Sequence, residues 1–464
     1  MLKAVELENF RAFSKQVRFD IKPITVLIGR NNSGKSTLLK WLQMARQSVR
    51  GSSEYEFLCP NGDHVALGAW NDARNKAVRH KKHRFALGLE ARLPPLQCLD
   101  AGKPDGQQQS GRPVQTEETP MALCSVRGDC LYQTDEPIGM QEIVITNRDG
   151  GHLFSQTIRN LRGSGLLKPP LQTGDHWMKS AADDQRYLDP MRRFIGSVKH
   201  LSALRMETRS VIDNRTPPRG DVGHMGENTI QHLVAILSNG ARKTPGQIDF
   251  ILRHSRSVLH IDDLKIRRLG DGLVLRPEGR NMDTKEKHRL GDFGIGVNQA
   301  LPVFVQGAIM EAGELLTVEQ PEAQLHPTVQ LELGSFFAEL WKERGVASII
   351  ETHSGNILLR LRRLVREGYL ESGDVGVCYC TMDKDRAEVV NMNVTNGGEL
   401  DGHLPMEFFG ADIFEALEFN AIAHAAGDDH GGEPHRNSSA NQVRLRPEEG
   451  NDRGTVRSRA NPAH

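Results

Sequence analysis

Four short apolar runs in this chain have the length and the continuous apolar character of buried strands. They occupy residues 24–28, 314–318, 346–350 and 375–381. Helical spacing of apolar residues lies between these runs, at residues 297–310, 328–342 and 354–367. Because strands that alternate with helices form a parallel sheet with helices on its faces, the pattern predicts an α/β fold with a parallel or mixed central sheet.

Alternating apolar and polar positions predict additional β-structure elsewhere in the chain. The first 28 residues begin with a hairpin pattern, and further strands or hairpins are expected at residues 83–93, 142–158 and 263–276. A short apolar helix is expected at residues 230–237. Heptad repeats do not persist between the first buried strand and residue 290, so this region is predicted to be globular and not a coiled-coil arm.

Length and composition narrow the class of protein. A chain of 464 residues exceeds the usual size of one core, which implies several modules or one module with a large insertion. The 59 basic and 59 acidic residues balance, so global charge gives no argument for nucleic acid or membrane binding. No signal-peptide pattern opens the chain and no apolar run approaches ~18 residues, so we expect a soluble, cytoplasmic protein. The six cysteines lack paired C-x₂-C spacing and are expected to be reduced thiols.

The strongest chemical motif is a glycine-rich loop, GRNNSGKST, at residues 29–37, directly after the first buried strand. Its glycines allow successive N–H groups to converge on phosphate oxygens at the start of a helix, and Lys35 adds a positive charge. Ser36 supplies the hydroxyl that such P-loops use as a Mg²⁺ ligand. The alternative, a glycine-rich turn with a chance lysine, does not explain the order of strand, loop and helix. The residues expected to contact the nucleotide here are Gly29, Asn31, Asn32, Ser33, Gly34, Lys35, Ser36 and Thr37.

A second motif is the apolar strand that ends in carboxylates at residues 319–322. An acidic residue at the end of the strand beside the P-loop would hold Mg²⁺ against the nucleotide phosphates, as in a Walker B motif. Glu319 is the candidate for this role. The alternative is a strand end with solvated acids, which is common in chains that have no P-loop.

Two further motifs flank this strand in the chain. A glycine-rich turn, GDFGIGVNQ, enters a helix at residues 291–299, and the sequence ETHS ends the next strand at residues 351–354. The order of the four motifs resembles the linear layout of ABC-type ATPases. The resemblance implies that His353 contacts the γ-phosphate, and that the glycine-rich turn offers N–H groups and a helix dipole to the ATP of the opposite subunit. Taken alone, the turn and a histidine before a serine helix cap are more often structural. The signature residues implied by the resemblance are Gly294, Gly296, Asn298 and Gln299.

The chain is similar to the ABC-type predicted ATPases of prophages and bacterial defence regions, which are related to the RecF, SMC and OLD ATPase heads. The matching pieces are residues 8–13, 29–37, 200–205, 293–302, 318–327, 349–354 and 402–409. Asn298 departs from the serine that is usual in such signature loops.

The resemblance implies an α/β P-loop NTPase head of the ABC type with β-rich insertions over residues 1–420. Its expected parts are a P-loop lobe from 1–50 and 290–381, an inserted α+β region at about 51–289 and a short carboxy-terminal domain at about 382–420. A polar stretch at 102–120 and a tail at 421–464 fall outside the resemblance. The tail holds almost no large apolar residues and is predicted to be disordered.

The residue after Glu319 changes the expected mechanism. Most ABC ATPases have a catalytic glutamate at this position, whereas this chain has Gln320. An amide cannot take a proton from water, although it can orient a water molecule. Glu322 and Glu351 are the remaining carboxylates near the expected γ-phosphate position, so we expect slow hydrolysis of Mg-ATP.

The sequence leaves two functions open. One is an ATPase that forms an ATP-gated dimer or higher homo-oligomer and acts in bacterial defence or in a process on DNA or a DNA-bound complex. The other is a nucleotide-gated scaffold or sensor that restrains a partner effector, such as a nuclease or toxin, with little turnover. Basic clusters at residues 76–84 and 360–366 could contact DNA, but they lack interleaved aromatic residues and are more typical of solvated faces. No membrane partner is expected.

Overall fold

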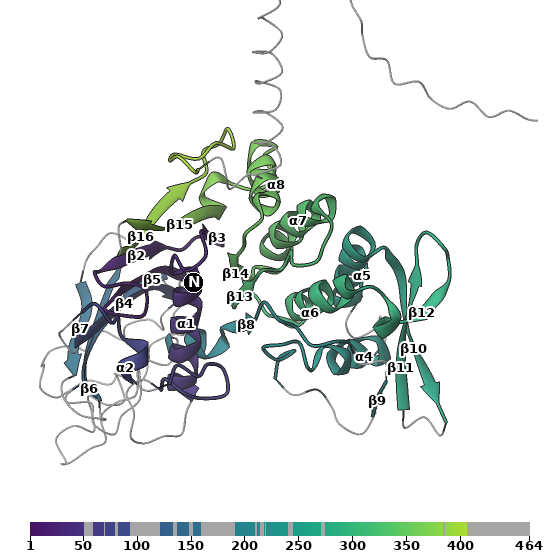
Figure 1. Cartoon of the computed structure of the whole chain (residues 1–464), viewed down its shortest axis with the longest axis horizontal. Helices are drawn as coiled ribbons and strands as arrows, with labels where there is room; N and C mark the ends of the chain where they lie inside the picture. Colours follow the sequence, from purple (N-terminus) through teal and green to yellow (C-terminus); the bar gives the residue numbers. More distant parts are fainter. Residues whose placement is uncertain are drawn as a thin grey trace, which may run out of the picture. The chain divides into compact units, whose positions relative to one another are not determined.

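The computed structural model contains three β-sheets in the part of the chain that it describes. One is a mostly parallel central sheet, and the other two are antiparallel. Figure 1 shows the helices and strands of this part of the chain. The described residues are 1–50, 59–68, 70–78, 82–92, 121–132, 137–147, 152–158, 191–208, 211–213, 218, 220–239, 245–270, 274–383 and 386–405.

The central sheet confirms the predicted α/β architecture. Its strands are β3 (Ile24–Gly29), β8 (Lys199–Leu201), β13 (Leu315–Glu319), β14 (Ala347–Glu351), β15 (Val375–Asp383) and β16 (Arg386–Asn393). They pair in the order β16-β15-β3-β14-β13-β8. The five strands from β15 to β8 run parallel, and β16 pairs antiparallel with β15 at one edge. The sheet is therefore mixed, and β8 and β16 join it from outside the predicted P-loop lobe.

The order of the central strands corrects one expectation. β14 lies between β3 and β13, so the strand that ends at Glu319 is not the neighbour of the P-loop strand. The register places Glu351 opposite Leu27 on one side and opposite Glu319 on the other. The prediction that Glu319 ends the strand beside the P-loop is wrong, because apolar runs reveal strands without revealing the order in which they pair. Glu351 occupies that position.

The central strands are buried on both faces, which explains their uninterrupted apolar runs. The helices around them are α1 (Lys35–Arg50), α4 (Thr229–Asn239), α5 (Pro245–Leu259), α6 (Ile295–Ile309), α7 (Pro327–Arg344) and α8 (Gly355–Arg366). Val26 and Ile28 of β3 pack in one apolar core with residues of α4 to α8. Leu27 packs in a second core with α1 and the first antiparallel sheet. The five predicted helices, α1, α4, α6, α7 and α8, are present, and α5 was not predicted.

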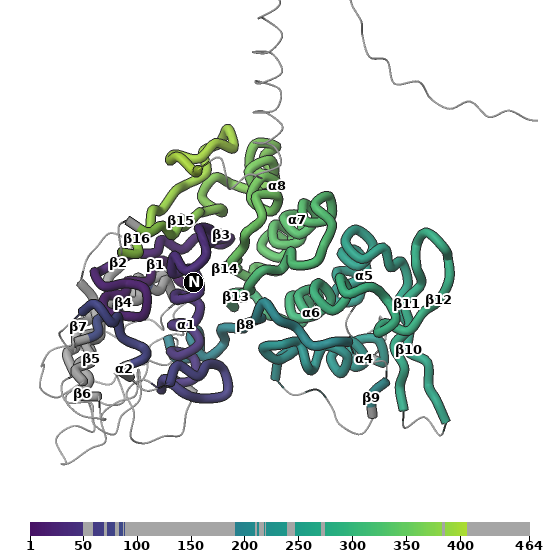
Figure 2. Tube along the Cα trace, viewed as in Figure 1, coloured from purple at the N-terminus to yellow at the C-terminus, as the bar shows by residue number. Residues whose placement is uncertain are grey.

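Two antiparallel sheets provide the predicted β-rich regions. The first consists of β1 (Leu2–Glu8), β2 (Val17–Asp20), β4 (Lys82–Arg92), β5 (Met121–Tyr132), β6 (Pro137–Asn147) and β7 (His152–Ile158). The second consists of β9 (Ile212–Asp213), β10 (Ile261–Leu269), β11 (Val274–Asn281) and β12 (Lys287–Arg289). The three predicted hairpins are confirmed as β1–β2, β6–β7 and β10–β11. In Figure 2, β16 lies beside β2, where the central sheet meets the first antiparallel sheet.

Two predicted segments lie outside the described residues. They are the polar stretch at 102–120 and the tail at 421–464.

Candidate functional site

The P-loop joins β3 to α1 and curves around a cleft at the carboxyl ends of the central strands. Gly29, Asn32 and Gly34 have left-handed backbone conformations, with φ of 145°, 62° and 99°. A Cβ atom at Gly29 would collide with the carbonyl oxygen of Cys380, and one at Gly34 would lie 2.9 Å from Phe13 Cζ. Only glycine fits at these two positions, as the motif predicts.

The Lys35 ammonium group lies inside the curve of this loop. Its Nζ donates hydrogen bonds to the carbonyl oxygens of Gly29, at 2.8 Å, and Arg30, at 2.7 Å. Lys35 is 4% exposed, and burial lowers its pKa while Glu351 opposes this shift. The ammonium group is therefore a buried point charge placed for an anion held by the loop.

Ser36 is paired with a carboxylate of the neighbouring strand. Its Oγ donates a hydrogen bond to Glu351 Oε1 at 2.8 Å, and Glu351 Oε2 has no hydrogen-bond partner among the described residues. Burial, followed by repulsion from Glu319, raises the pKa of Glu351 to about 7. A buried carboxylate with an unpaired oxygen beside a hydroxyl has the oxygen ligands that a hard divalent cation prefers.

Glu319 ends β13 next to this pair, and Gln320 follows it in the chain. Gln320 has a φ of 42°, which is uncommon for a residue other than glycine, and its N–H donates to the carbonyl oxygen of Glu351 at 2.7 Å. Glu319 Oε2 accepts a hydrogen bond from the Ala203 N–H at 3.4 Å, and burial raises the pKa of Glu319. The two strand ends are thus bonded to each other and to the segment after β8.

His353 extends this wall of the cleft, and Glu322 is hydrogen-bonded to it. Glu322 Oε1 accepts a hydrogen bond from the His353 N–H at 2.9 Å, and Glu322 Oε2 has no partner among the described residues. Burial raises the pKa of Glu322. Burial, followed by repulsion from Lys35, lowers the pKa of His353, so its imidazole is neutral at pH 7.

The cleft has a volume of about 670 Å³ and gathers most of the predicted site residues. Those that line it are Asn31, Asn32, Gly34, Lys35, Ser36, Thr37, Gln320, Glu351 and His353. Gly29 and Ser33 belong to the loop without lining the cleft. Glu319 and Glu322 do not line it either, but they are bonded to the wall through the contacts described above.

The predicted signature loop lies away from this cleft. Gly294 is the N-cap of α6 and Gly296 is in its first turn, and neither lines the cleft. The side chains of Asn298 and Gln299 accept hydrogen bonds from their own chain, and Gln299 Oε1 receives its bond from Arg205 Nη1 at 2.8 Å. None of the four signature residues lines this cleft of its own chain.

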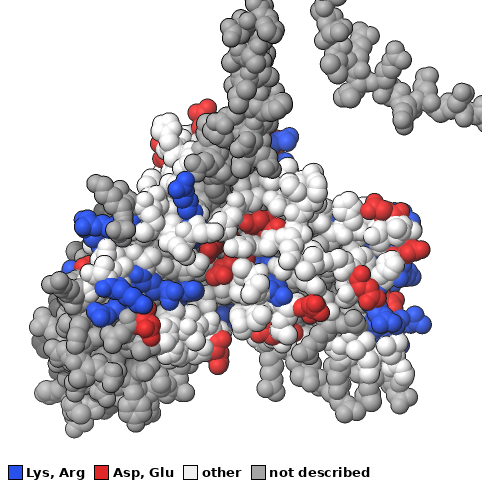
Figure 3. Space-filling model, viewed as in Figure 1, with Lys and Arg blue, Asp and Glu red and all other residues white. Residues whose placement is uncertain are grey.

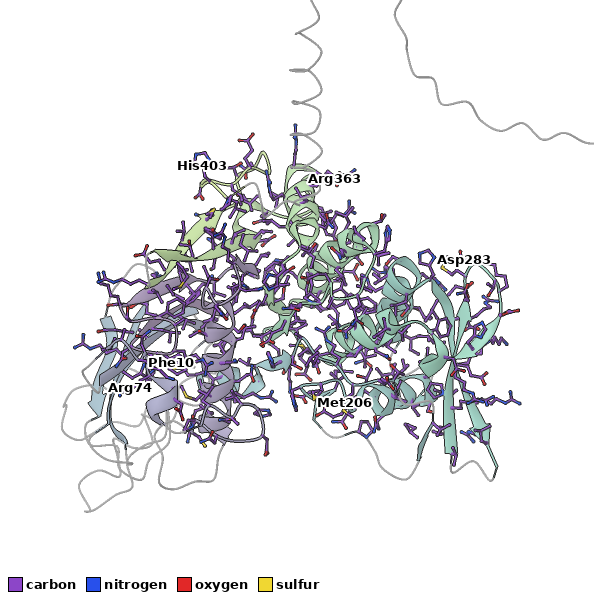
Figure 4. The ribbon with its side chains drawn as sticks, in the orientation of Figure 1. Phe10, Arg74, Met206, Asp283, Arg363 and His403 are labelled. Carbon is purple, nitrogen blue, oxygen red and sulfur yellow. The ribbon has the colours of Figure 1, made fainter. Side chains whose placement is uncertain are left out.

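The opposite wall of the cleft comes mainly from two turns that the sequence analysis did not assign to the site. The N–H of Arg11 donates to the carbonyl oxygen of Ala73, and Asn75 Nδ2 donates to that of Arg11, both at 2.8 Å. Figure 4 shows Phe10 and Arg74 close together on these turns. The lining residues that were not predicted are Arg11, Ala12, Lys40, Asp72, Arg74, Asn75, Lys76, Ala77 and Met382. Because four of them are basic, the cleft favours an anionic ligand.

The two basic clusters considered for DNA binding have different surroundings. In the first, Lys76 lines the cleft, whereas His83 is buried with Nδ1 2.9 Å from the Glu8 carbonyl oxygen. Residues 79–81 lie outside the described part of the chain. Figure 3 shows acidic and basic side chains on the same face. Three arginines of the second cluster donate hydrogen bonds within their own chain, namely Arg360, Arg362 and Arg363.

Residues 1–83 match a family model described as an AAA ATPase domain. The matched region contains the P-loop and both turns of the opposite wall. The α/β fold, the P-loop geometry and this match together define the fold of the chain as that of a P-loop NTPase. A comparison with curated proteins finds no match.

Three solved SMC head structures are similar to the chain. The SmcHead bound to the C-winged helix domain of ScpA is 12% identical, with 85% of this chain and 98% of that chain covered and a TM-score of 0.45. The SMC head domain from Thermotoga maritima is 12% identical, with coverage of 84% and 98% and a TM-score of 0.36. The Smc head domain with an extended coiled coil bound to the C-terminal domain of ScpA, derived from Pyrococcus furiosus, is 10% identical, with coverage of 91% and 99% and a TM-score of 0.40.

Among the described helices, none combines the length and the apolar character needed to cross a membrane.

Proposed function

We propose that this protein is an ABC-type ATPase that binds Mg-ATP in the P-loop cleft. The observation that carries the proposal is the convergence of Lys35, Ser36 and Glu351 on one cleft whose opposite wall is basic. The loop N–H groups, the lysine and the basic wall match the negative charge of a triphosphate. A volume of about 670 Å³ lies within the usual range of ~300–1,000 Å³ for small-molecule sites.

Mg²⁺ is the expected second ligand of the site. Ser36 Oγ and the Glu351 carboxylate would hold it, and Glu319 on the next strand supplies a further carboxylate. The unpaired Oε2 of Glu351 and its raised pKa support a cation here, because a buried carboxylate is unfavourable without a positive partner. When bound, Mg²⁺ neutralises charge on the β- and γ-phosphates.

The same wall supports hydrolysis, with three residues in different roles. Gln320 lines the cleft and can orient the attacking water but cannot accept its proton. Glu351, as a ligand of the Mg²⁺, would hold the metal against the phosphates, and neutral His353 is placed to contact the γ-phosphate. Turnover is expected to be slow, because the residue after Glu319 is an amide.

A second copy of the chain is expected to complete the site. The start of α6 is outside the cleft, and Ile295 in its first turn is 54% exposed. A helix N-terminus at the surface can offer N–H groups to the γ-phosphate held by another copy. This arrangement supports an ATP-gated homodimer with composite sites.

Mixing two variants tests the composite site. Lys35→Ala and Gly296→Trp, each present in every chain, damage both sites of a homodimer. In a heterodimer of the two variants, one site collects both defects and the other collects neither. The mixture should therefore regain part of the hydrolysis and of the ATP-dependent dimerisation, measured by light scattering. Normal hydrolysis by monomeric Gly296→Trp would show that the signature loop is an ordinary turn.

Gln320 also favours a second function, that of a nucleotide-gated scaffold which restrains an effector such as a nuclease or toxin. In this function ATP binding sets the conformation and turnover is secondary. Hydrolysis rates with and without DNA separate the two. Stimulation by DNA supports an ATPase that acts on DNA or a DNA-bound complex in bacterial defence. An unchanged slow rate, with effector retention that depends on ATP, supports the scaffold.

A further inference from the structure

The peptide group between Glu319 and Gln320, at the end of β13, forms hydrogen bonds through both its carbonyl oxygen and its N–H. The carbonyl oxygen of Glu319 accepts a hydrogen bond from Arg205 Nη2 at 2.8 Å. The N–H of the same peptide, which belongs to Gln320, donates to the carbonyl oxygen of Glu351 at 2.7 Å. These two bonds support the strained backbone of Gln320, whose φ is 42°. They therefore set the direction in which Gln320 enters the cleft.

Arg205 connects this peptide to α6. Its Nη1 donates to Gln299 Oε1 at 2.8 Å, so the two arms of one guanidinium group reach two different elements. A second bond runs in parallel, from the Thr208 N–H to Asn298 Oδ1 at 2.8 Å. The segment after β8 thus joins the end of β13 to the first turns of α6 within one chain.

The surroundings of Arg205 keep it charged and fixed. Arg205 is 8% exposed. Burial lowers its pKa to about 10, while the charges of Glu322 and Glu319 oppose this shift, so the guanidinium remains protonated at neutral pH. Leu204, the residue before it, is 77% exposed. The segment therefore has one buried anchor and one side chain at the surface.

We propose that Arg205 is a positioning residue that holds the Glu319–Gln320 peptide in place and couples it to the first turns of α6 in the same chain. The proposal rests on the proposed ATPase function. It assigns a role to the segment 200–205, which P-loop chemistry alone does not explain. Its consequence is that the state of α6 affects hydrolysis in the chain's own cleft, in addition to any contact with the nucleotide of a second copy.

The chemistry of this contact requires arginine. A planar guanidinium donates along several fixed directions at once, whereas a lysine ammonium is a point charge on a flexible stem. Arg205→Lys should therefore keep the charge but lose one of the two bonds. Arg205→Met should lose both bonds while keeping much of the apolar stem.

The first test compares turnover with nucleotide binding. Arg205→Met should lower kcat by about tenfold or more, because small displacements of positioning groups have effects of this size. The KM for ATP and the stoichiometry of bound nucleotide should stay within about threefold, since Lys35 and the loop are unchanged. Arg205→Lys should recover part of kcat. Unchanged kcat in Arg205→Met would overturn the proposal.

Arg344→Met is the matched control for simple destabilisation. Arg344 is a second arginine bound to α6, although it is only partly buried, and it donates to the carbonyl oxygens of Gly307, Ala308 and Met310 at the other end of the helix. This variant should lower Tm while kcat per bound nucleotide stays unchanged. An equal loss of kcat per bound nucleotide in both variants would show that Arg205 only stabilises the fold, which contradicts the proposal. If Arg205→Met does not fold, Gln299→Leu removes the α6 partner alone and should also lower kcat.

The second test separates action within a chain from action between chains. A mixture of Arg205→Met and Lys35→Ala should not regain activity, because each change damages the site of its own chain. A mixture of Gly296→Trp and Lys35→Ala should regain part of it, because the Gly296→Trp chain keeps its own P-loop and Arg205 and receives an intact α6 start from the other copy. Recovery in both mixtures would show that Arg205 acts only through the neighbouring copy, which contradicts the proposal. Failure of the wild-type protein to hydrolyse ATP would instead contradict the proposed function.

Discussion

The P-loop wall and the carboxylate wall of the cleft are built in different ways. The P-loop wall is one contiguous stretch, residues 29–37, whose shape follows from glycines at the positions that need them. The carboxylate wall brings Gln320 and Glu351 together from separate strands, and Arg205, from another part of the chain, holds one of its peptides. The first wall therefore depends on local sequence, and the second on strand order and long-range hydrogen bonds. We expect the first to govern nucleotide affinity and the second to govern turnover.

Removing the charge of Glu351 should have the largest effect on the carboxylate wall. Glu351→Gln should lower ATP hydrolysis by about a hundredfold, because the Mg²⁺ at the β- and γ-phosphates would lose a carboxylate ligand. ATP affinity should change by only about fivefold or less if the P-loop wall governs binding. Steady-state kinetics and a nucleotide titration measure the two quantities.

Glu339→Gln is the control for this change, because Glu339 is a partly buried carboxylate that pairs with Arg253 and does not line the cleft. It should leave hydrolysis unchanged. Full activity in Glu351→Gln, together with loss of activity in Glu319→Gln, would show that Glu319 of β13, and not Glu351 of β14, is the main catalytic carboxylate.

Restoring a carboxylate after Glu319 should have a smaller effect with the opposite sign. Gln320→Glu is expected to raise hydrolysis by about tenfold or more if the missing base limits the rate. Gln320→Asn keeps the amide and serves as the control without a gain. No gain in Gln320→Glu, combined with loss in Glu351→Gln or Glu322→Gln, would show that one of these carboxylates already takes the proton.

The smallest expected effect is on stability, and it concerns the packing of α5 and α7 against α6. His254 of α5 packs against Phe304 of α6 and Phe336 of α7. Burial, followed by the charge of Arg253, lowers the pKa of His254 to about 3, even though Glu339 Oε2 lies 3.4 Å from its Nε2. In the unfolded chain the imidazole takes up a proton near pH 6.5, whereas in the native chain it does so only near pH 3. The free energy of unfolding therefore falls as the pH decreases from about 6.5 to about 3.

Thermal denaturation between pH 7 and 5 measures this loss. His254→Gln should lose less Tm over this interval than the wild-type protein, because glutamine does not titrate. An equal loss of Tm in both proteins would show that groups other than His254 determine the acid sensitivity of the protein.

The difference between the two walls also explains what could be predicted from the sequence. Gly29, Lys35 and Ser36 lie in one contiguous loop, so the motif alone identifies them. The strand order that puts Glu351 beside Ser36 arises from pairing between distant segments, and apolar periodicity contains no information about it. The helix α5 was missed for a different reason. Its polar residues interrupt the apolar pattern, although its apolar face packs on α6.

The basic wall was missed because its turns carry no chemical motif. Arg11 lies in the matching piece 8–13 and Lys76 in a basic cluster, and both were visible only as family similarity or solvated charge. Bonds between the two turns bring them to the cleft. Arg205 was likewise visible only within the matching piece 200–205, because a single arginine predicts neither of its two partners.

The most direct test of a nucleotide site in the P-loop cleft is an equilibrium titration of Mg-ATP into the wild-type protein and into Lys35→Ala. The wild-type chain should bind one ATP per chain, and affinity should fall when Mg²⁺ is chelated. Lys35→Ala should lose affinity by about tenfold to a hundredfold, the range for one buried charge-assisted contact, with Tm nearly unchanged. Equal affinity in the two proteins, or no binding by the wild-type chain, would contradict a nucleotide site in this cleft.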